Sequence, residues 1–393
     1  MEIKRLAVGD QVEVEIGNVA HGGHFIARHE GQVIFVRHGI TGERAIIEIT
    51  HVTSKIARAD VIKVIDPSPA RVDAPCKYAT PELCGGCDFQ HIDLAFQREL
   101  KRRVVVEQFK RIGGIDIELD VKKVPPTDGL HWRTRMDFAI SPRGKMGLYS
   151  SRSNAVIELD DCLIASEKMN LKELTSRTWK GSDRVEVAVS SSGERNVTRG
   201  GRSITGPTEL HESVLGNSYI CSTTTFWQSH SAAPETLMAT ALAWLDPKPG
   251  DVAADLYGGA GLFTAPISKA VGATGKVHLI ELDKSAIADA RNIFKSTKNV
   301  EIRQGRVEVE MKKISSVDVV LLDPPRTGAG AEVVGSIVKA NPRKIIYVSC
   351  DPASLARDAK DLLAGGYEIG QIVGYDLFPM TAHVECITEF RKR

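Results

Sequence analysis

The chain has 393 residues, of which 42% are hydrophobic and 26% are charged, and its formal net charge at pH 7 is +1. This length predicts two or three globular domains. The sequence has no apolar run of about 18 residues, which excludes a membrane-spanning helix, and its first residues lack the apolar segment of a signal peptide. We therefore expect a cytoplasmic protein, in which disulfides are rare and the seven cysteines need another role.

The charge is spread evenly along the chain. The net charge is −1 over 1–66, zero over 67–130, +2 over 131–225 and zero over 226–393. No segment has the basic excess that is typical of nucleic-acid-binding proteins. Any contact with RNA must therefore come from local patches.

Residues 1–65 predict a small antiparallel β-barrel. Short runs with alternating polar and apolar residues occupy 11–16, 32–36 and 44–49, and glycine-containing turns separate them. Several short strands at this spacing indicate a small barrel. The run at 66–69, Asp-Pro-Ser-Pro, then predicts a stiff linker, because proline disfavours helix at its own position and at the residue before it.

Four cysteines form a candidate metal site. Cys76, Cys84 and Cys87 lie close together, with two glycines between the last two, and Cys162 lies far downstream. Four thiolates suit either a structural zinc ion or an iron–sulfur cluster, and the spacing alone does not decide between them. The alternative, scattered free thiols, is disfavoured by the tight Cys-Gly-Gly-Cys turn.

The middle of the chain predicts a helix and then a mixed α/β region. The helix spans 92–112 and is stopped by two glycines at 113–114. Its basic residues predict a solvated face, with an RNA contact as the alternative; they are Arg98, Lys101, Arg102, Arg103, Lys110 and Arg111. A β-hairpin is expected within 132–149, and short strands continue to about residue 225.

Residues 226–393 alternate between strands and helices, which predicts a doubly wound parallel sheet with right-handed crossovers. The predicted strands are 252–256, 276–281, 300–303, 317–322 and 344–348. Ligands bind at the carboxyl ends of the strands in such sheets. Residues that directly follow these strands are therefore the candidates for chemistry.

Four of these strand ends carry residues of the types that bind a nucleotide-like ligand or take part in catalysis. A glycine-rich turn at 257–261 allows a nucleotide-like ligand to approach closely, and Glu281 lies where an acidic side chain binds ribose hydroxyls. The Asp-Pro-Pro-Arg run at 323–326 resembles the acidic Pro-Pro motif of methyltransferases that act on bases. Arginine replaces the aromatic residue of amino-methylating enzymes, which argues against an exocyclic amine as the target. Cys350, within Ser-Cys-Asp-Pro, is a candidate nucleophile, and a buried structural cysteine is the alternative.

These motifs resemble, in order and over nearly the whole chain, those of the S-adenosylmethionine-dependent RNA uracil-5-methyltransferase family. The matching runs are 226–228, 255–261, 323–326, 349–352 and 383–385. The resemblance implies an α/β protein with three domains. These would be a TRAM-like β-barrel at 1–65, a central iron–sulfur and RNA-contacting domain at 66–225, and a Rossmann-like class I methyltransferase domain at 226–393.

The resemblance also implies roles for single residues. The thiolate of Cys350 would add to C6 of uracil so that C5 can attack the methyl group, and Glu385 would act as the general base that removes the hydrogen from C5. S-adenosyl-L-methionine would be held by Gln228, Tyr257, Glu281 and Asp323. A 4Fe-4S cluster would be held by Cys76, Cys84, Cys87 and Cys162.

The expected substrate is a uridine in single-stranded or looped RNA, because the target base must leave any stack to enter a pocket. The resemblance favours 23S rRNA over the T-loop of tRNA, because the TRAM-like barrel and the cluster occur together most often in rRNA enzymes. A cytosine-5 methyltransferase is disfavoured because serine, not proline, precedes the cysteine. A non-catalytic RNA-binding iron–sulfur protein is disfavoured by the joint presence of Cys350 and Glu385. No obligate protein partner is expected.

Overall fold

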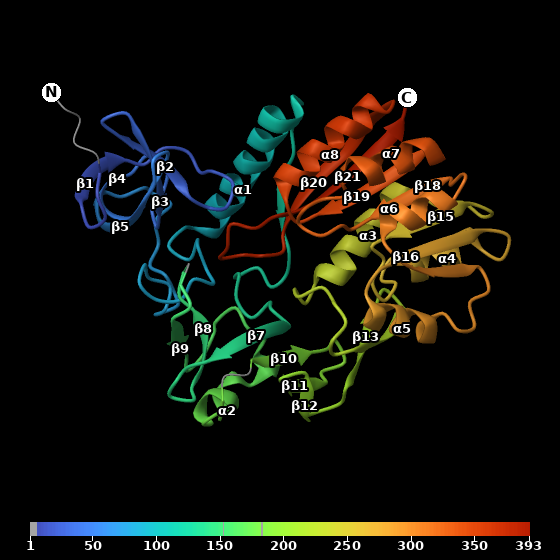
Figure 1. Cartoon of the computed structure of the whole chain (residues 1–393), viewed down its shortest axis with the longest axis horizontal. Coiled ribbons are helices and arrows are strands. Elements are labelled where there is room, and N and C mark those ends of the chain that lie inside the picture. The colour runs from blue at the N-terminus through green and yellow to red at the C-terminus, as the bar shows by residue number, and fades with distance from the viewer. Residues whose placement is uncertain (1–5, 152, 182–183) are drawn as a thin grey trace.

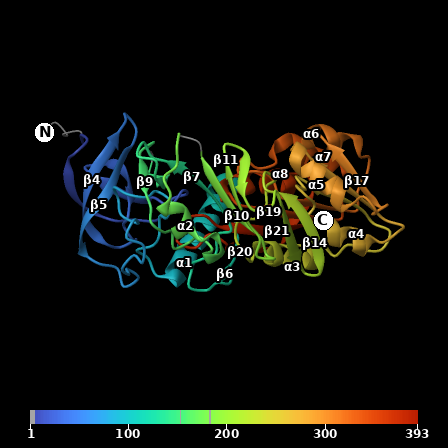
Figure 2. The same ribbon diagram turned by 90° about the horizontal axis from the view of Figure 1, so that it is seen from below.

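The structure is a computed structural model that describes residues 6–151, 153–181 and 184–393. It has three parts (Figure 1): an N-terminal sheet in blue, a middle sheet in green, and a large C-terminal sheet with helices in yellow to red. The view from below shows the N-terminal sheet at one end of the long axis, and beyond it the middle sheet overlaps part of the C-terminal sheet (Figure 2). Within the described ranges, no helix is both long and apolar enough to cross a membrane.

The N-terminal part is a curled five-stranded sheet with the order β1-β4-β5-β3-β2. The strands are β1 (Gln11–Glu15), β2 (Phe25–His29), β3 (Gln32–Arg37), β4 (Arg44–Val52) and β5 (Ala57–Asp66). Neighbouring strands are antiparallel, as predicted, with the exception of β3 and β5, which are parallel. Every second side chain points into the core. That core also takes in four apolar side chains from the segment that follows, namely Phe89, Ile92, Leu100 and Val104.

The predicted helix is present as α1 (Leu94–Gln108), and one π-helical turn, η1 (Phe109–Gly113), extends it to Gly114. The side chain of Asp93 caps its start by accepting hydrogen bonds from two backbone N–H groups. The prediction of a solvated basic face is wrong for Lys101, whose side chain is completely buried against Asp376. Arg102 and Arg103 both pair with Glu99 on the same helix.

The middle part is a six-stranded antiparallel sheet with the order β12-β11-β10-β7-β8-β9, followed by the hairpin β13-β14. The predicted hairpin within 132–149 is confirmed as β7 paired with β8. The strands are β7 (Arg135–Ile140), β8 (Met146–Tyr149), β9 (Val156–Glu158), β10 (Val185–Val189), β11 (Arg195–Arg199), β12 (Arg202–Thr205), β13 (Glu209–Val214) and β14 (Asn217–Ser222). The helical segments are η2 (Glu167–Met169) and α2 (Leu171–Ser176).

The C-terminal part is an eight-stranded sheet with the order β17-β16-β15-β18-β19-β21-β20-β6. The five predicted strands are present and parallel: β15 (Val252–Leu256), β16 (Lys276–Glu281), β17 (Val300–Gln304), β18 (Val319–Leu322) and β19 (Lys344–Ser349). Beyond them, β21 (Glu385–Lys392) lies antiparallel between β19 and β20 (Tyr367–Asp376). The edge strand is β6 (Val121–Lys123), which comes from the middle of the chain and is parallel to β20.

Helices cover both faces of this sheet, so that it has two apolar cores. One core contains side chains of α3 (Ala233–Leu245), α4 (Thr264–Val271) and α5 (Lys284–Ile293). The other contains side chains of α1, α7 (Gly330–Ala340) and α8 (Pro352–Ala364), with the short α6 (Val307–Glu310) and η3 (Met311–Lys313) beside them. Because both faces are buried at its centre, the central parallel strand β18 is apolar throughout and β19 nearly so, which is why the sequence predicted them well.

Candidate active site

The two residues proposed for covalent chemistry lie side by side at the carboxyl edge of the parallel strands. Strands β19 and β21 are antiparallel, with Ser349 opposite Cys386. Cys350 directly follows β19, and Glu385 is the first residue of β21, so they are the next pair in this register. Glu385 is 4% exposed, whereas the Cys350 thiol is half-buried. The antiparallel direction of β21 therefore brings its first residue to the ligand-binding edge.

Asp323 lies between this pair and the glycine-rich turn. Strand β18 runs between β15 and β19, with Leu322 opposite both Leu256 and Tyr347. Asp323 is the next residue after β18, and its Oδ2 accepts a hydrogen bond of 3.1 Å from Nε2 of Gln228. Two of the four residues predicted to bind the cofactor are thus in direct contact.

The other two belong to the ends of β15 and β16. Tyr257 follows β15 with a positive φ of 61°, which is unusual for a residue other than glycine. The carboxylate of Glu281 accepts hydrogen bonds from the backbone N–H of Gly259 at 3.0 Å and of Leu282 at 2.6 Å. Glu281 therefore ties the glycine-rich turn to the end of the next strand. A Cβ added at Gly259 would meet no atom within 4 Å, whereas one added at Gly261 would lie 2.4 Å from the ring of Phe294; the turn is therefore open at Gly259 and closely packed at Gly261.

Buried carboxyl groups give this edge an unusual electrostatic character. Burial and the nearby Asp255 together raise the pKa of Asp323 to about 7. Burial likewise raises the pKa of Asp255 to about 7, and its Oδ1 has no hydrogen-bond partner in the part of the chain that the structure describes. A cationic ligand would relieve both effects because it stabilises the charged carboxylates. S-adenosylmethionine, with its sulfonium and amino groups, fits this requirement.

The same environment disfavours the thiolate when no ligand is bound. Burial and, to a smaller extent, the charge of Glu385 raise the pKa of Cys350 to about 12. Burial also raises the pKa of Glu385 well above its ordinary value, and Asp323 adds to the effect. Arg326 opposes both shifts because its positive charge favours the two anions. The arginine of the Asp-Pro-Pro-Arg run is therefore placed to activate the pair.

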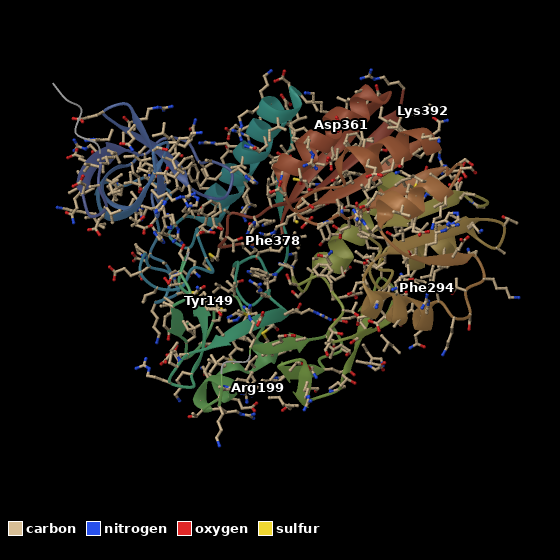
Figure 3. The ribbon with its side chains drawn as sticks, in the orientation of Figure 1. Tyr149, Arg199, Phe294, Asp361, Phe378 and Lys392 are labelled. Atoms are coloured by element: carbon tan, nitrogen blue, oxygen red, sulfur yellow. The ribbon has the colours of Figure 1, made fainter. Side chains whose placement is uncertain are left out.

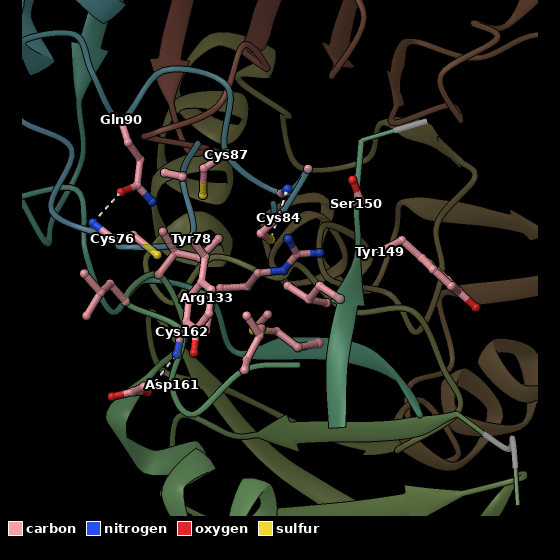
Figure 4. A pocket seen from close by; sticks show the side chains of 18 of the residues that line it. Cys76, Tyr78, Cys84, Cys87, Gln90, Arg133, Tyr149, Ser150, Asp161 and Cys162 are labelled. Atoms are coloured by element: carbon pink, nitrogen blue, oxygen red, sulfur yellow. Dashed lines mark hydrogen bonds between the residues drawn. The ribbon is translucent and has the colours of Figure 1, made fainter. Parts of the chain in front are cut away.

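The four predicted metal ligands line one cavity of about 320 Å³ (Figure 4): Cys76, Cys84, Cys87 and Cys162. The backbone N–H of Cys76 donates to Oε1 of Gln90 at 3.0 Å, and the N–H of Gly86 donates to Sγ of Cys84 at 3.4 Å. The structure thus brings Cys162, which is distant in the sequence, to the other three cysteines.

The four thiols share a cavity, but within the described ranges no group of three or more His, Cys, Asp or Glu residues is arranged to hold a metal ion. By its chemistry, a set of four thiols suits a zinc ion and an iron–sulfur cluster alike. Burial raises the pKa of Cys162 to about 11 and also raises that of Cys84. Metal binding must therefore displace protons from these thiols.

Sequence reasoning did not identify three residues near these sites. Arg133 also lines the cysteine cavity and extends between the cysteines (Figure 4). Arginines at 133 and 135, two residues apart next to a predicted strand, were a signal that they share one face.

His21 forms an ion pair of 2.9 Å with Asp351, next to Cys350. Phe378 lies centrally where the three parts of the molecule meet (Figure 3), and its ring packs edge-on against Trp132. The sequence around His21 and Phe378 gave no comparable signal.

Comparison with known proteins assigns the chain to a family. Residues 213–393 match the family model described as tRNA (Uracil-5-)-methyltransferase, and residues 5–62 match that of the TRAM domain. An uncharacterized RNA methyltransferase of Streptomyces coelicolor is 39% identical, over 97% of this chain and 92% of its own length. Another, from Corynebacterium glutamicum, is 36% identical over 98% of both chains. The chain belongs to this family of RNA methyltransferases.

A solved structure supports the fold of the whole RNA methyltransferase. The Pyrococcus abyssi tRNA (uracil-54, C5)-methyltransferase, in complex with S-adenosyl-L-homocysteine, aligns with a TM-score of 0.73 and 21% identity. The alignment covers 96% of this chain and 99% of that one. The predicted class I methyltransferase fold with an N-terminal TRAM domain is therefore confirmed.

Proposed function

We propose that this RNA methyltransferase transfers the methyl group of S-adenosyl-L-methionine to C5 of a uridine. The observation that carries the proposal is the position of Cys350 and Glu385 on adjacent strand ends, beside Asp323 at the ligand-binding edge. We assign the reaction to the domain at 226–393, RNA contacts to the domain at 66–225 and the TRAM domain to 1–65. A reducing cytoplasm would keep the nucleophilic thiol available.

In this mechanism Cys350 and Glu385 act in turn. The Cys350 thiolate forms a bond to C6 of uracil, and the electrons of the C5–C6 double bond move to give an enolate. C5 of the enolate would then form a bond to the methyl group of S-adenosyl-L-methionine while the bond between that methyl group and the sulfonium sulfur breaks, so that neutral S-adenosyl-L-homocysteine is the leaving group. Glu385 removes the remaining hydrogen from C5 as a proton, and the electrons of that bond restore the double bond as the thiolate leaves C6. Arg326 favours both the thiolate and the carboxylate by its charge.

We further propose that Gln228, Tyr257, Glu281 and Asp323 hold S-adenosyl-L-methionine. Their support is the location of Tyr257, Glu281 and Asp323 at neighbouring strand ends and the hydrogen bond that joins Gln228 to Asp323. Asp323 would become ionised as the cationic cofactor binds, because the pKa of this carboxyl is raised by burial. The charge of the cofactor would also help to lower the pKa of the nearby Cys350 thiol.

We propose that Cys76, Cys84, Cys87 and Cys162 hold a 4Fe-4S cluster. The common cavity and the donor set of four thiolates support this assignment. The ligands come from two distant segments, so a cluster would cross-link the segment before α1 to the middle sheet. The mechanism needs no redox step, and the role proposed for the cluster is structural.

Two substitutions test the chemistry. Cys350→Ala should abolish methyl transfer from labelled cofactor to unmodified RNA while cofactor binding is retained. Glu385→Gln should allow methylation of C5 but block elimination, so that a protein–RNA adduct persists on a denaturing gel. Cys386→Ala is the matched control, because this neighbouring thiol is buried in the core. Substantial turnover by the Cys350→Ala variant would rule out the covalent mechanism.

For the RNA itself, we propose 23S rRNA rather than the T-loop of tRNA. The support is the TRAM domain together with the cysteine set, a combination that the family resemblance associates with rRNA enzymes. The test maps 5-methyluridine in both RNAs from cells with and without this protein. Loss confined to tRNA would overturn the rRNA assignment and leave the chemistry at Cys350 unaffected.

A further inference from the structure

A loop of the TRAM domain, residues 20–24, makes two contacts near the edge of the sheet that carries Cys350 and Glu385. Nε2 of His21 lies 2.9 Å from Oδ2 of Asp351, the residue that follows Cys350. At Gly23, an added Cβ would lie only 2.4 Å from the Cβ of Ala382, so the two backbones are closely packed. Ala382 precedes Glu385 in the segment that leads into β21. The two contacts therefore lie next to the proposed nucleophile and next to the proposed base.

The first contact is made to Asp351, which belongs to the turn that contains Cys350. Oδ1 of Asp351 accepts a hydrogen bond of 2.8 Å from the N–H of Ser354 and so caps α8. The hydroxyl of Ser349 accepts from the N–H of Asp351 at 3.2 Å and donates to its carbonyl oxygen at 3.1 Å. Cys350 is thus enclosed between two residues that bind one another. His21 supplies the partner for the other carboxylate oxygen of Asp351, and it comes from a different domain.

The groups around His21 favour its charged form. The hydrogen bond to Asp351 raises the pKa of the imidazole, and Glu107 raises it as well. Burial and Arg111 act in the opposite direction, with the balance toward a raised pKa. The same contact helps to lower the pKa of Asp351 to about 2, against its burial. The pair is therefore a charge-assisted hydrogen bond, which is roughly twice as strong as a neutral one.

The second contact, at Gly23, packs against the segment of residues 377–384, which α1 also holds. Oε1 of Gln97 accepts a hydrogen bond of 2.9 Å from the N–H of Met380, and Lys101 holds Asp376 and the carbonyl of Phe378. Gly23 packs against the same segment from the TRAM side. The path of residues 377–384, and with it the start of β21 at Glu385, is therefore fixed from both sides.

We infer that the TRAM domain is a structural part of the catalytic centre, with His21 and Gly23 acting as positioning residues for Cys350 and Glu385. This inference rests on the proposed function. It predicts that the loop at 20–24 sets the rate of the chemical step, and not only the affinity for RNA. If the TRAM domain only bound RNA, the rate of the chemical step would not depend on these two contacts.

The first test uses the full chain with His21→Ala, His21→Gln and the control His51→Ala, an exposed histidine on β4 of the same domain. Single-turnover methyl transfer is measured at saturating RNA and cofactor. We expect His21→Ala to lower the rate by about tenfold to a hundredfold, because small displacements of reacting groups have effects of this size, with little change in KM for RNA. His21→Gln should restore part of the rate, since its side-chain amide can donate to Asp351. His51→Ala should behave as wild type.

The second test compares Gly23→Ala with Gly22→Ala. Both glycines have a positive φ, 81° and 88°, so both variants carry similar backbone strain. Only the Cβ at Gly23 would strike Ala382, because a Cβ at Gly22 meets no atom within 4 Å. We expect the Gly23 variant to lose substantially more of the single-turnover rate. Equal losses in the two variants would overturn the contact at Ala382 as a positioning contact.

A third measurement separates this inference from the proposed function. The alkylation rate of Cys350 by iodoacetamide, followed by mass spectrometry, does not depend on any RNA reaction. A changed rate in His21→Ala and a near-normal rate in His21→Gln would support positioning, even if wild-type protein made no 5-methyluridine. Unchanged alkylation and turnover, or a raised KM for RNA at unchanged kcat, would overturn it. Thermal unfolding of each variant identifies any global loss of fold. If His21→Ala does not fold, a single-turnover rate of His21→Gln below that of wild type supports positioning, and a wild-type rate overturns it.

Discussion

The buried ion pair between α1 and β20 tests how the middle of the chain supports the catalytic edge. The Nζ of Lys101 lies 2.5 Å from Oδ1 of Asp376 and 2.9 Å from the carbonyl oxygen of Phe378. The side chains of the pair are 0% and 3% exposed. Lys101→Met keeps much of the apolar stem but removes the ammonium group, and it leaves the Asp376 carboxylate buried without its partner.

The expected cost follows from that burial. Breaking a buried pair by removing one partner costs about 3–5 kcal/mol, because an uncompensated charge remains. Whole domains are stable by only about 5–15 kcal/mol, so Lys101→Met should remove a large share of the free energy of unfolding. Adding Asp376→Asn removes the stranded charge, and the double variant should regain much of the loss. The Lys101→Met variant should also methylate RNA more slowly, because the segment before Glu385 loses its anchor.

Urea unfolding followed by circular dichroism measures the free energies. The control is Lys110→Met, which breaks the pair between Lys110 and Asp116, where the side chains are 62% and 82% exposed. Exposed pairs contribute about 0–1 kcal/mol, so this variant should unfold almost as the wild type does. A Lys101→Met variant within 1 kcal/mol of wild type would refute the reasoning. So would a double variant that is less stable than Lys101→Met alone.

Two further predictions concern metal binding and pH. If the proposed cluster is present, anaerobically prepared wild-type protein should contain iron and sulfide, and Cys84→Ser should lose most of both. The variant should also unfold at lower temperature, because the cross-link between the cysteine segments is lost. Stoichiometric zinc without iron in the wild-type protein would contradict the cluster. The apo protein should lose stability as the pH rises from about 4 to 7, because burial raises the pKa of Asp255 and of Asp323 to about 7, and the folded state then binds more protons than the unfolded chain. Asp255→Asn should reduce the difference in unfolding free energy between pH 4 and pH 7. An unchanged difference would show that the Asp255 carboxyl does not cause this pH dependence.

The sequence predicted the parallel strands within about two residues because a strand buried on both faces is apolar throughout. It did not predict the direction of β21, since periodicity carries no information about which way a strand runs. It also missed β6, which has three residues and joins the sheet only through tertiary contacts with β20. Short edge strands of this kind lack a local pattern that distinguishes them from loops.

In the candidate site, too, residues that follow predicted strands could be identified from the sequence, whereas contacts between distant segments could not. Asp323 and Cys350 could be placed together because each ends a parallel strand, and such ends meet at one edge. Lys101 was expected on a solvated face because most charged helix residues lie there; its partner Asp376 is 275 residues away. His21 and Asp351 are 330 residues apart. Contacts at these separations depend on domain packing, which local sequence patterns do not encode.

The core of the TRAM domain includes side chains from outside residues 1–65, and this limits how its role can be tested by deletion. The linker at 66–69 suggests a barrel that could be removed cleanly, but Phe89, Ile92, Leu100 and Val104 complete its core and are at most 7% exposed. Removing the barrel would expose these side chains, at about 1.5–3 kcal/mol each or roughly 6–12 kcal/mol together. That total is comparable with the stability of an entire domain. A truncated chain could therefore lose activity by unfolding around α1, which also anchors the segment before Glu385. Loss of methyl transfer on truncation would not identify an RNA-binding role, whereas the point variants at 21–23 change the contacts and leave this core in place.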